Sequence, residues 1–503
     1  MPELLVRVEA VNLDSFVYDT QDISTVRGGG LLLLDMAADL ETALGAQCGL
    51  TKVFTAGSIG LFHAESGDAD TIKASIRQWI SNKPALRDAT ILVEASEISN
   101  GFADASTNVQ SQIRWSQMQS PTLVYPTALD EDRICIYDRV RPASETEPNK
   151  AEPHDARDPV SAATKLRRKD GKRQKQRFYH REAGVPADWN YTHDLEELTN
   201  NTNQDMGNLH HKMALIYLDG NKFSGLFVCN DRDELGNRSR VVRANQRSVL
   251  HHILNKVFDT QNKVFDTQDD AVLRVETLLW GADEIIWAVP AWLGWWWMNE
   301  FFTHYGRLGP WEIEGRTVLT TDCYAGNYPL THGAAIVFCH HDAPIQRVIQ
   351  LARNLADWPK EKGQVNTFTY QVLESFDHLG EDAGTARLAR IPRDLGKDFY
   401  CLPGNNMDKI RENILRLKGC VPKGELHHLV QLLCRDRDLI KEAGDQAVIL
   451  VAKSKKRDAN ATAYLDGLAN ALGMDSRAAW IHLLELWDYV ITPATASTSG
   501  SPQ

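Results

Sequence analysis

Two segments, ALIYLDGNKFSG (214–225) and LLWGADEIIW (278–287), decide the fold of this 503-residue chain. Each begins with an apolar run typical of a buried strand and continues into a turn that contains glycine and acidic residues. Asp219 ends the first strand, and Asp283 and Glu284 lie on a hairpin turn in the second segment. If these two strands are neighbours in one sheet, the three carboxylates converge at one edge of it.

The elements around these segments complete one supersecondary unit. Residues 213–218 are predicted to form its first strand, and apolar residues at helical spacing predict a helix over 241–258. Residues 272–289 are predicted to form two strands around a tight turn. The remaining predicted elements are a helix at 291–304, a strand at 331–338, a helix at 344–357 and a strand at 367–375. The order is β-α-β-β-α-β, which is the ferredoxin-like arrangement.

The same order occurs nearer the N-terminus. Its predicted elements are a strand at 4–18, a helix at 31–44, a hairpin at 52–63, a helix at 70–81 and a strand at 90–94. Helices in the C-terminal part are predicted from apolar stripes at 409–417, 426–434 and 463–488. The sequence therefore predicts an α+β protein with two ferredoxin-like (βαββαβ) palm, or nucleotidyl-cyclase, domains and a helical C-terminal domain.

Shifts in composition give the predicted domain boundaries. Residues 143–160 are rich in Pro, Glu and Ala and have no apolar period, which is typical of a linker. The tail after Pro493 is poor in apolar residues. The predicted units are a degenerate first palm at 1–140, a linker with a basic arm at 141–205, a catalytic second palm at 206–385, a helical domain at 386–491 and a disordered tail at 492–503.

The basic arm has two interpretations. Residues 165–181 contain nine Lys or Arg residues and one acid. The simpler interpretation is a solvated, mobile arm. The functional alternative is an electrostatic contact with RNA or with a protein partner.

The composition excludes several classes of protein. A chain with 43% apolar and 24% charged residues is not a disordered, collagenous or small disulfide-framework protein. The net charge of −12 argues against general coating of nucleic acid. Eight scattered cysteines without a CxxC motif are typical of reduced thiols in a cytosol. The most apolar run, 285–298, has fourteen residues, fewer than the roughly 20 that span a bilayer. Since the N-terminus also lacks a signal-peptide pattern, we expect a cytoplasmic protein without membrane contact.

The three carboxylates are the strongest chemical signal. Mutual repulsion makes such a cluster costly unless a cation neutralises it. Mg²⁺ binds a few carboxylates and keeps positions for phosphate oxygens, and two such ions can activate a hydroxyl and stabilise a leaving pyrophosphate. Small residues at Gly281 and Ala282 would let a triphosphate approach the backbone. The simpler alternative is that each acid is an ordinary turn or strand-end residue.

These segments resemble those of a known family. GADE at 281–284 resembles the Gly-Gly-Asp-Asp or GGDE turn of the large polymerase-cyclase subunit of type III CRISPR effectors. LDGNKFSG at 218–225 resembles the Asp-containing first strand of that family. THGAAIVFCHHDAP at 331–344, followed by a helix ending near Lys360, is similar to its late strand and helix. TAGSIGLF at 55–62 occupies the place of the metal turn in the first palm, without a carboxylate. The family is related to GGDEF diguanylate cyclases and class III adenylyl cyclases.

The resemblance implies a function and a set of site residues. It implies an active second palm that converts nucleoside triphosphates, ATP above all, into cyclic nucleotides or oligonucleotides for antiviral signalling through a downstream effector. The first palm begins within the first ten residues. The resemblance is therefore to a compact relative without the HD nuclease domain. The expected ligands of two Mg²⁺ or Mn²⁺ ions are Asp219, Asp283, Glu284 and the carbonyl of Gly220.

The resemblance also implies that Lys360 lies near the triphosphate, with an ordinary exposed lysine at a helix end as the alternative. Apart from the resemblance, Gly281 and Ala282 are expected nucleotide contacts because they are small. Asn221 and Phe223 are a hypothesis for the base pocket, with plain core packing as the alternative for Phe223.

A non-catalytic function is the main alternative. The chain would then hold RNA or nucleotide as a sensor or scaffold subunit of a type III-like complex. RNA or a protein as activator, and a second copy as oligomeric partner, are left open. A template-dependent polymerase would need a long basic cleft, which an acidic chain does not favour. His340, His341 and Asp342 form a second candidate metal site, although such residues are more often polar loop groups.

Overall fold

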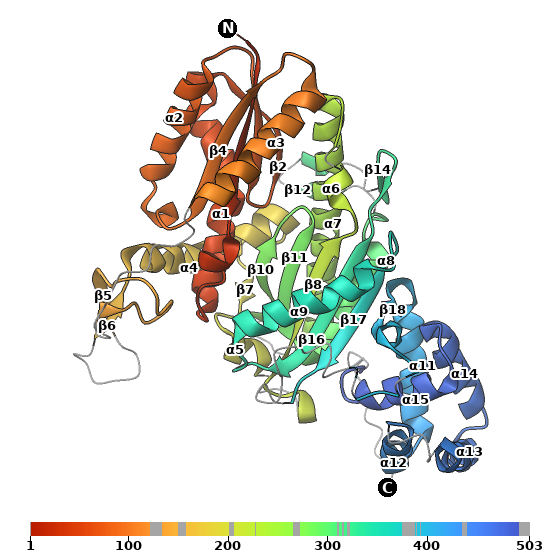
Figure 1. Ribbon diagram of the computed structural model, residues 1–503. Coiled ribbons are helices and arrows are strands. Elements are labelled where there is room, and N and C mark those ends of the chain that lie inside the picture. Colours follow the sequence, from red (N-terminus) through yellow and green to blue (C-terminus); the bar gives the residue numbers. More distant parts are fainter. Residues whose placement is uncertain are drawn as a thin grey trace.

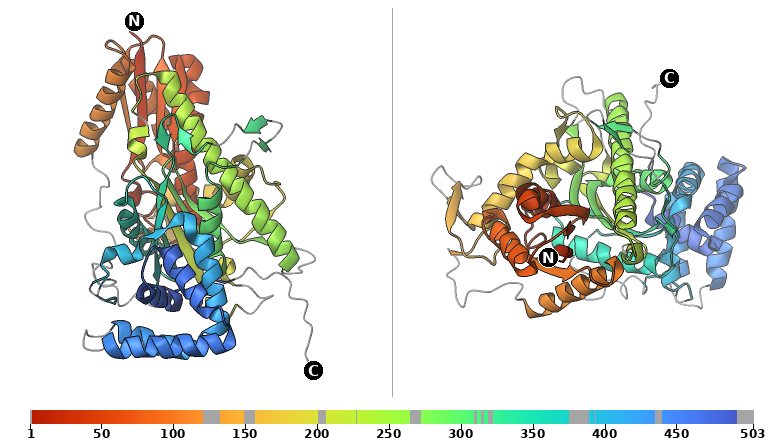
Figure 2. Two further views of the ribbon diagram at one scale, coloured as in Figure 1. Left: turned by 90° about the vertical axis from the view of Figure 1, so that its right-hand side faces the viewer. Right: turned by 90° about the horizontal axis from the view of Figure 1, so that it is seen from above.

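The computed structural model is a mixed α+β structure with a helical C-terminal region (Figures 1 and 2), as the sequence predicts. The predicted disordered tail at 492–503 lies outside the described residues. The described residues are 2–120, 133–148, 157–200, 206–226, 228–264, 272–308, 311–313, 316–318, 322–374, 388, 390–392, 394–434 and 440–491.

The first sheet has the strand order β2-β3-β1-β4, and all its neighbouring strands are antiparallel. Because successive side chains of a strand point to opposite faces, Leu4, Val6 and Val8 pack in one apolar cluster with residues of helices α1 and α2. Helix α3, which the sequence analysis did not predict, contacts the sheet through the other face. The elements are β1 (Leu4–Val11), α1 (Ile23–Cys48), β2 (Leu50–Ala56), β3 (Ile59–Ala64), α2 (Ala69–Ser81), β4 (Thr90–Glu97) and α3 (Phe102–Gln119).

The second sheet has the strand order β10-β11-β8-β16-β17-β18. Its strands β8, β10, β11 and β16 follow the same spatial order as the four strands of the first sheet. Strand β17 adds to them in parallel with β16, after the crossover helix α9. The elements are β8 (Lys212–Gly220), α7 (Arg232–Val264), β10 (Glu276–Trp280), β11 (Glu284–Pro290), α8 (Ala291–His304), β16 (His332–His340), α9 (Ile345–Lys360), β17 (Thr367–Val372) and β18 (Leu402–Pro403).

The two faces of strand β8 have different partners. Ala214, Ile216 and Leu218 belong to the apolar cluster that includes α7 and the tryptophan-rich helix α8. The alternate residues Leu215 and Tyr217 belong to the cluster that includes α9 and α1. Asp219 is next in this second series, so its carboxylate lies on the face that α9 covers.

Helices and short elements fill the rest of the described chain. Figure 1 shows the first sheet above the second and the C-terminal helices beside the second. The C-terminal helices are α11 (Met407–Cys420), α12 (Lys423–Cys434), α13 (Ile440–Arg457), α14 (Ala461–Leu472) and α15 (Ser476–Glu485). The shorter elements are β5 (Glu145–Pro148), β6 (Arg157–Val160), β7 (Asn190–Tyr191), α5 (Leu195–Thr199), α6 (Phe223–Leu226), β9 (Val272–Leu273), β12 (Trp311–Ile313), β13 (Arg316–Val318), β14 (Tyr324–Ala325) and β15 (Tyr328–Pro329).

Within these described ranges, every helix is too short or too polar to cross a bilayer.

The interpretation of 165–181 as a solvated, mobile arm is wrong. This segment lies within helix α4 (Ala162–Ala183), which packs along α1. Arg167 is fully buried, and its guanidinium donates to Asp19 Oδ2 at 3.0 Å. Arg167 and Lys175 therefore neutralise buried acids from other parts of the chain, which no local pattern of α4 reveals.

A buried ion cluster joins α4 to helix α1 and to strand β10 of the second sheet. Glu276, at the start of β10, accepts from Arg27 of α1 at 2.6 Å and from Lys175 of α4 at 2.8 Å. The exposed fractions of the three side chains are 2%, 4% and 6%. Burial lowers the pKa of Lys175 to about 8, although Glu276 opposes the shift. The cluster holds three elements from distant parts of the sequence in one place.

Helices α1 and α4 cross at two glycines, Gly28 and Gly171. A Cβ atom at Gly171 would overlap the carbonyl oxygen of Ser24, and one at Gly28 would overlap that of Arg167. Since these obstacles are backbone atoms, the helices would have to separate. We expect Gly171→Ala to lower the free energy of unfolding by about 1–3 kcal/mol in chemical denaturation.

The control for this prediction is Gly444→Ala. Gly444 is exposed in the interior of α13, and a Cβ atom there meets nothing within 4 Å. Alanine at such a site stabilises a helix by roughly 0.5–1 kcal/mol. Equal effects of the two substitutions would contradict the close crossing of α1 and α4.

Candidate active site

The strand register brings the predicted acidic residues to one edge of the second sheet. Asp219 of β8 is paired with Glu284 of β11 and with Gly333 of β16. Asp283 precedes Glu284 on the β10–β11 turn, and its carbonyl oxygen accepts from the Gly220 amide at 2.9 Å. The backbone itself therefore places Asp219, Asp283 and Glu284 side by side.

Two further side chains contact the carboxylates of Asp219 and Glu284. Lys360, at the end of α9, donates to Asp219 Oδ2. The Tyr217 hydroxyl lies 2.5 Å from Glu284 Oε1 and 3.2 Å from Asp219 Oδ2. The sequence analysis missed Tyr217, although its position two residues before Asp219 places both on one face of the strand.

The electrostatics of this edge disfavour negative charge. Burial raises the pKa of Asp219 to about 6; Lys360 opposes this shift, and Glu284 and Asp283 add to it. Partial desolvation and the neighbouring Glu284 also raise the pKa of Asp283, although this residue keeps an exposed surface. Charged carboxylates here cost free energy that a bound cation would recover. A set of carboxylate and carbonyl oxygens is also the donor chemistry that Mg²⁺ and Mn²⁺ prefer.

The raised pKa of Asp219 predicts a pH-dependent stability. An Asp in an unfolded chain has a pKa near 3.9, so the folded state binds more protons than the unfolded state between about pH 4 and pH 6. Stability from this group therefore falls as pH rises through that window. We expect wild type to lose about 1 kcal/mol relative to Asp219→Asn between pH 5 and pH 7.5. The measurement is the free energy of unfolding of both proteins at both pH values. A constant difference between them would contradict a raised pKa.

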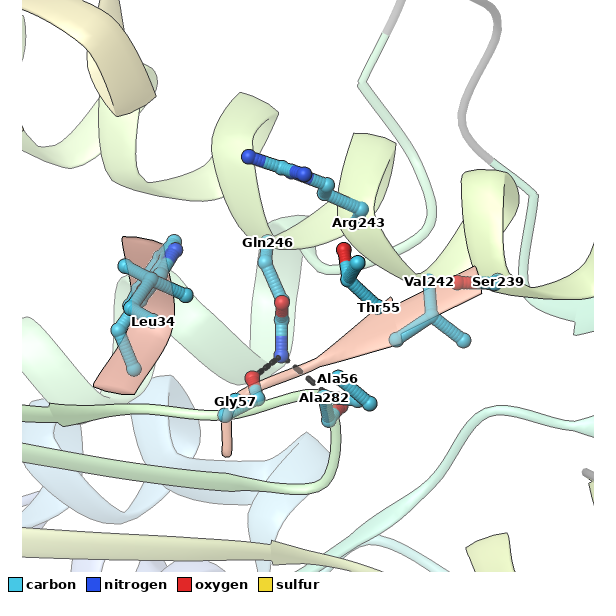
Figure 3. Close-up of a pocket in the computed structure, with 11 residues that line it drawn as sticks. Leu34, Thr55, Ala56, Gly57, Ser239, Val242, Arg243, Gln246 and Ala282 are labelled. Atoms are coloured by element: carbon cyan, nitrogen blue, oxygen red, sulfur yellow. Dashed lines mark hydrogen bonds between the residues drawn. The ribbon is translucent and has the colours of Figure 1, made fainter. Parts of the chain in front are cut away.

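The main chain of Gly281 and Ala282 is held by helix α7. The Gln246 side-chain amide donates to the carbonyl oxygens of Gly281 at 2.6 Å and Ala282 at 2.9 Å (Figure 3). Gln246 is 3% exposed, so it fixes the turn from inside the protein. The sequence analysis did not identify Gln246, because its partners lie more than thirty residues away.

The hairpin turns of the two sheets meet beside this contact. A Cβ atom on Gly57, in the β2–β3 turn, would lie 3.1 Å from the Cα of Gly281. The cavity between the turns, drawn in Figure 3, has a volume of about 20 Å³. That is room for one water molecule, so a nucleotide would have to approach Gly281 from elsewhere.

The two residues predicted beside the base are both buried. The Asn221 amide donates to Thr331 Oγ1 at 3.1 Å and to the Val365 carbonyl at 3.0 Å. The Phe223 ring is 2% exposed and packs against Gly220, where a Cβ atom would collide with it. In this arrangement both support the end of β8, and their role in base binding stays a prediction.

The first sheet has a single acid at the equivalent place. Glu9 of β1 is paired with Ile59, the first residue of β3, as Asp219 is paired with the first residue of β11. Its carboxylate accepts from Arg7 at 2.8 Å and from Arg114 of α3 at 2.9 Å. Ser58 and Ile59 replace the two acids of the other turn. The first sheet thus has one carboxylate, held by two arginines, where the second has three acidic residues, and its degeneracy stays a prediction.

Comparison with solved structures identifies the class of fold. No family model and no curated protein matches the sequence. The structural neighbours are large subunits of type III CRISPR complexes, which is the family that the GADE and LDG segments resemble. Csm1 from T.onnurineus is 13% identical and has a TM-score of 0.56, with 97% of this chain and 69% of that chain covered.

Complexes of Csm1 with Csm4 also share the fold. The Csm1-Csm4 cassette in complex with cA3 gives a TM-score of 0.53, and the cassette with pppApApA gives 0.52. Both are 13% identical and cover 97% of this chain, and the coverage of the other chain is 69% and 70% respectively. At such low identity the likeness establishes the fold. The chain is a structural relative of Csm1, and the predicted resemblance is confirmed at that level.

Proposed function

We propose that this chain is a nucleotidyltransferase that converts nucleoside triphosphates, ATP above all, into cyclic oligonucleotides for CRISPR-type antiviral signalling. The observation that carries the proposal is the set of Asp219, Asp283 and Glu284 at one sheet edge, where desolvation and mutual repulsion raise the pKa of Asp219 and of Asp283. Perturbed carboxylates of this kind are concentrated at functional sites. We interpret both sheets with their helices as ferredoxin-like palm domains, the second of them catalytic.

The structural relatives support the choice of substrate class. Solved Csm1-Csm4 cassettes contain cA4, cA3, pppApA or pppApApA. These are cyclic and linear oligoadenylates, which are the product and the intermediate of such a reaction. We therefore include a Csm4-like protein among the proposed partners, beside RNA, a downstream effector and a second copy of the chain. A cytoplasmic location stays part of this proposal.

The residues at the edge fit a pair of divalent cations. Asp219, Asp283, Glu284 and the carbonyl of Gly220 would hold Mg²⁺ or Mn²⁺, which when bound would stabilise charge on the phosphate oxygens. Lys360 would leave Asp219 and pair with the triphosphate. A ribose hydroxyl would attack the α-phosphate in line, the bond to pyrophosphate would break, and the hydroxyl proton would pass to solvent. A last attack of this kind, by a ribose hydroxyl on the α-phosphate at the other end of the same oligonucleotide, would release pyrophosphate and close the ring.

One observation favours the non-catalytic alternative. Lys360 already neutralises Asp219, as Arg7 and Arg114 neutralise Glu9 in the first sheet. If Lys360 never leaves, the second sheet is a nucleotide-binding scaffold in a type III-like complex. The two functions differ in turnover and not in nucleotide binding.

The test is incubation of the full chain with labelled ATP, GTP, CTP and UTP in Mg²⁺ or Mn²⁺, with and without RNA. Chromatography and mass spectrometry would resolve the products. We expect phosphatase-resistant cyclic products from wild type. Nucleotide binding without any product under all these conditions would contradict the cyclase and support the scaffold.

A further inference from the structure

Helices α7 and α8, which pack in a different apolar cluster from α9, carry a second cluster of titratable side chains. Glu300 and His304 lie one helical turn apart on α8, and His252 faces them from α7. Glu300 Oε2 lies 3.0 Å from His252 Nε2 and 3.3 Å from His304 Nε2. The Glu300 side chain is 6% exposed, and the two histidines are 26% and 27% exposed.

The arrangement of these three groups matches a metal site. Their ligand atoms all lie within 4.8 Å of one another. Tetrahedral zinc has bonds of about 2.0–2.2 Å to His nitrogen and carboxylate oxygen, which separates neighbouring ligand atoms by roughly 3.3 Å. The observed separations are already close to that value. We propose that His252, Glu300 and His304 bind a divalent transition-metal cation of the zinc class.

The site is built on rigid elements and keeps a position for a fourth ligand. Two helices that cover the same sheet supply the three side chains, so little ordering is needed when a cation binds. The neutral form of an imidazole is the one that binds metals. The exposed part of each histidine leaves room for water as fourth ligand.

Lys256 is the competing cation. Its ammonium lies 2.8 Å and 2.9 Å from the two oxygens of Glu300 and 5.8 Å from the centre of the Trp296 ring. The Lys256 side chain is 45% exposed, so water can replace Glu300 as its partner. Arg307 adds positive charge near His304. A bound cation must displace Lys256, and removal of that lysine should therefore strengthen binding.

A second histidine cluster supplies the control. His340, His341 and Asp342 also have ligand atoms within 4.8 Å, but they are consecutive residues, and the Asp342 side chain is 77% exposed. The sequence analysis singled out this cluster and not the one between α7 and α8. It missed that site because His252 lies 48 residues from Glu300.

The test is titration of the metal-free full chain with Zn²⁺ by calorimetry, and with Co²⁺ by visible absorption. We expect the chain to bind one Zn²⁺ ion tightly, and bound Co²⁺ to show the visible absorption of a tetrahedral site. His304→Gln should weaken Zn²⁺ binding by more than about 10-fold, and Lys256→Met should strengthen it. His340→Gln should leave the tight binding of this ion unchanged. Thermal unfolding of each variant without metal checks that it folds.

Two outcomes would overturn the site. One is a Zn²⁺ affinity that His304→Gln does not change, and the other is a loss of tight Zn²⁺ binding in His340→Gln. Weaker binding in Lys256→Met would also count against it, since a merely structural Lys256–Glu300 pair predicts that result. Nucleotide turnover does not enter the test, so its outcome is separate from that of the proposed function.

Discussion

Asp283→Asn combined with Glu284→Gln is expected to reduce the formation of cyclic products by about 1,000-fold. Both amides keep the size of the native side chains and remove the charge that would hold divalent cations. A loss of several kcal/mol of transition-state stabilisation corresponds to this factor. The measurement is the initial rate of pyrophosphate release from ATP, with products identified by mass spectrometry.

The same substitutions should make the protein more stable. Partial desolvation and the nearby Glu284 raise the pKa of Asp283, so removal of the charge relieves repulsion in the folded state. A higher melting temperature together with lost turnover is the signature of residues kept for function and not for stability. Asp342→Asn, an exposed acid at the other end of β16, is the matched control and should change neither property. Full activity in the double variant would place the chemistry elsewhere.

Glu276→Gln is expected to lower the free energy of unfolding by about 3–5 kcal/mol. The substitution leaves Arg27 and Lys175 buried without their carboxylate, and an unpaired buried charge is among the most destabilising defects in a protein. Chemical denaturation followed by circular dichroism measures the change. Lys175→Met added to Glu276→Gln removes one unpaired cation and should recover part of the loss.

An exposed ion pair made by another lysine of α4 provides the comparison for Glu276. Lys165 at the start of α4 bonds Glu145 at 2.7 Å, and the two side chains are 35% and 46% exposed. Pairs of this kind contribute about 0–1 kcal/mol, so Glu145→Gln should have little effect. Similar losses for both glutamates would show that the Glu276 cluster does not hold α4 in place.

The closeness of the acidic residues to one another could be predicted, because it follows from the order of the strands in the sheet. Once 214–219 and 284–289 are recognised as neighbouring antiparallel strands, Asp219 and Glu284 must lie near each other. Tyr217 could have been added by the alternation of strand side chains. Gln246 could not, because a long helix has many polar residues and only the packed fold shows which one reaches the turn.

The basic helix was misinterpreted for a related reason. A run of positive charge is usually solvated, and its burial requires acids that come from elsewhere. Those acids, Asp19 and Glu276, lie about 150 residues before and 100 residues after their partners on α4. Nothing in the local pattern points to them.

The contact between Gly57 and Gly281 gives the first sheet a mechanical role in the second. Because neither glycine has a side chain, the backbones of the two hairpin turns lie close together. A displacement of one turn toward the other would therefore move both. A methyl group on Gly57 would press on the Cα of Gly281 and so displace the acidic residues that follow it. The first sheet therefore helps to set the position of the acidic turn in the second, which gives a physical reason to retain it.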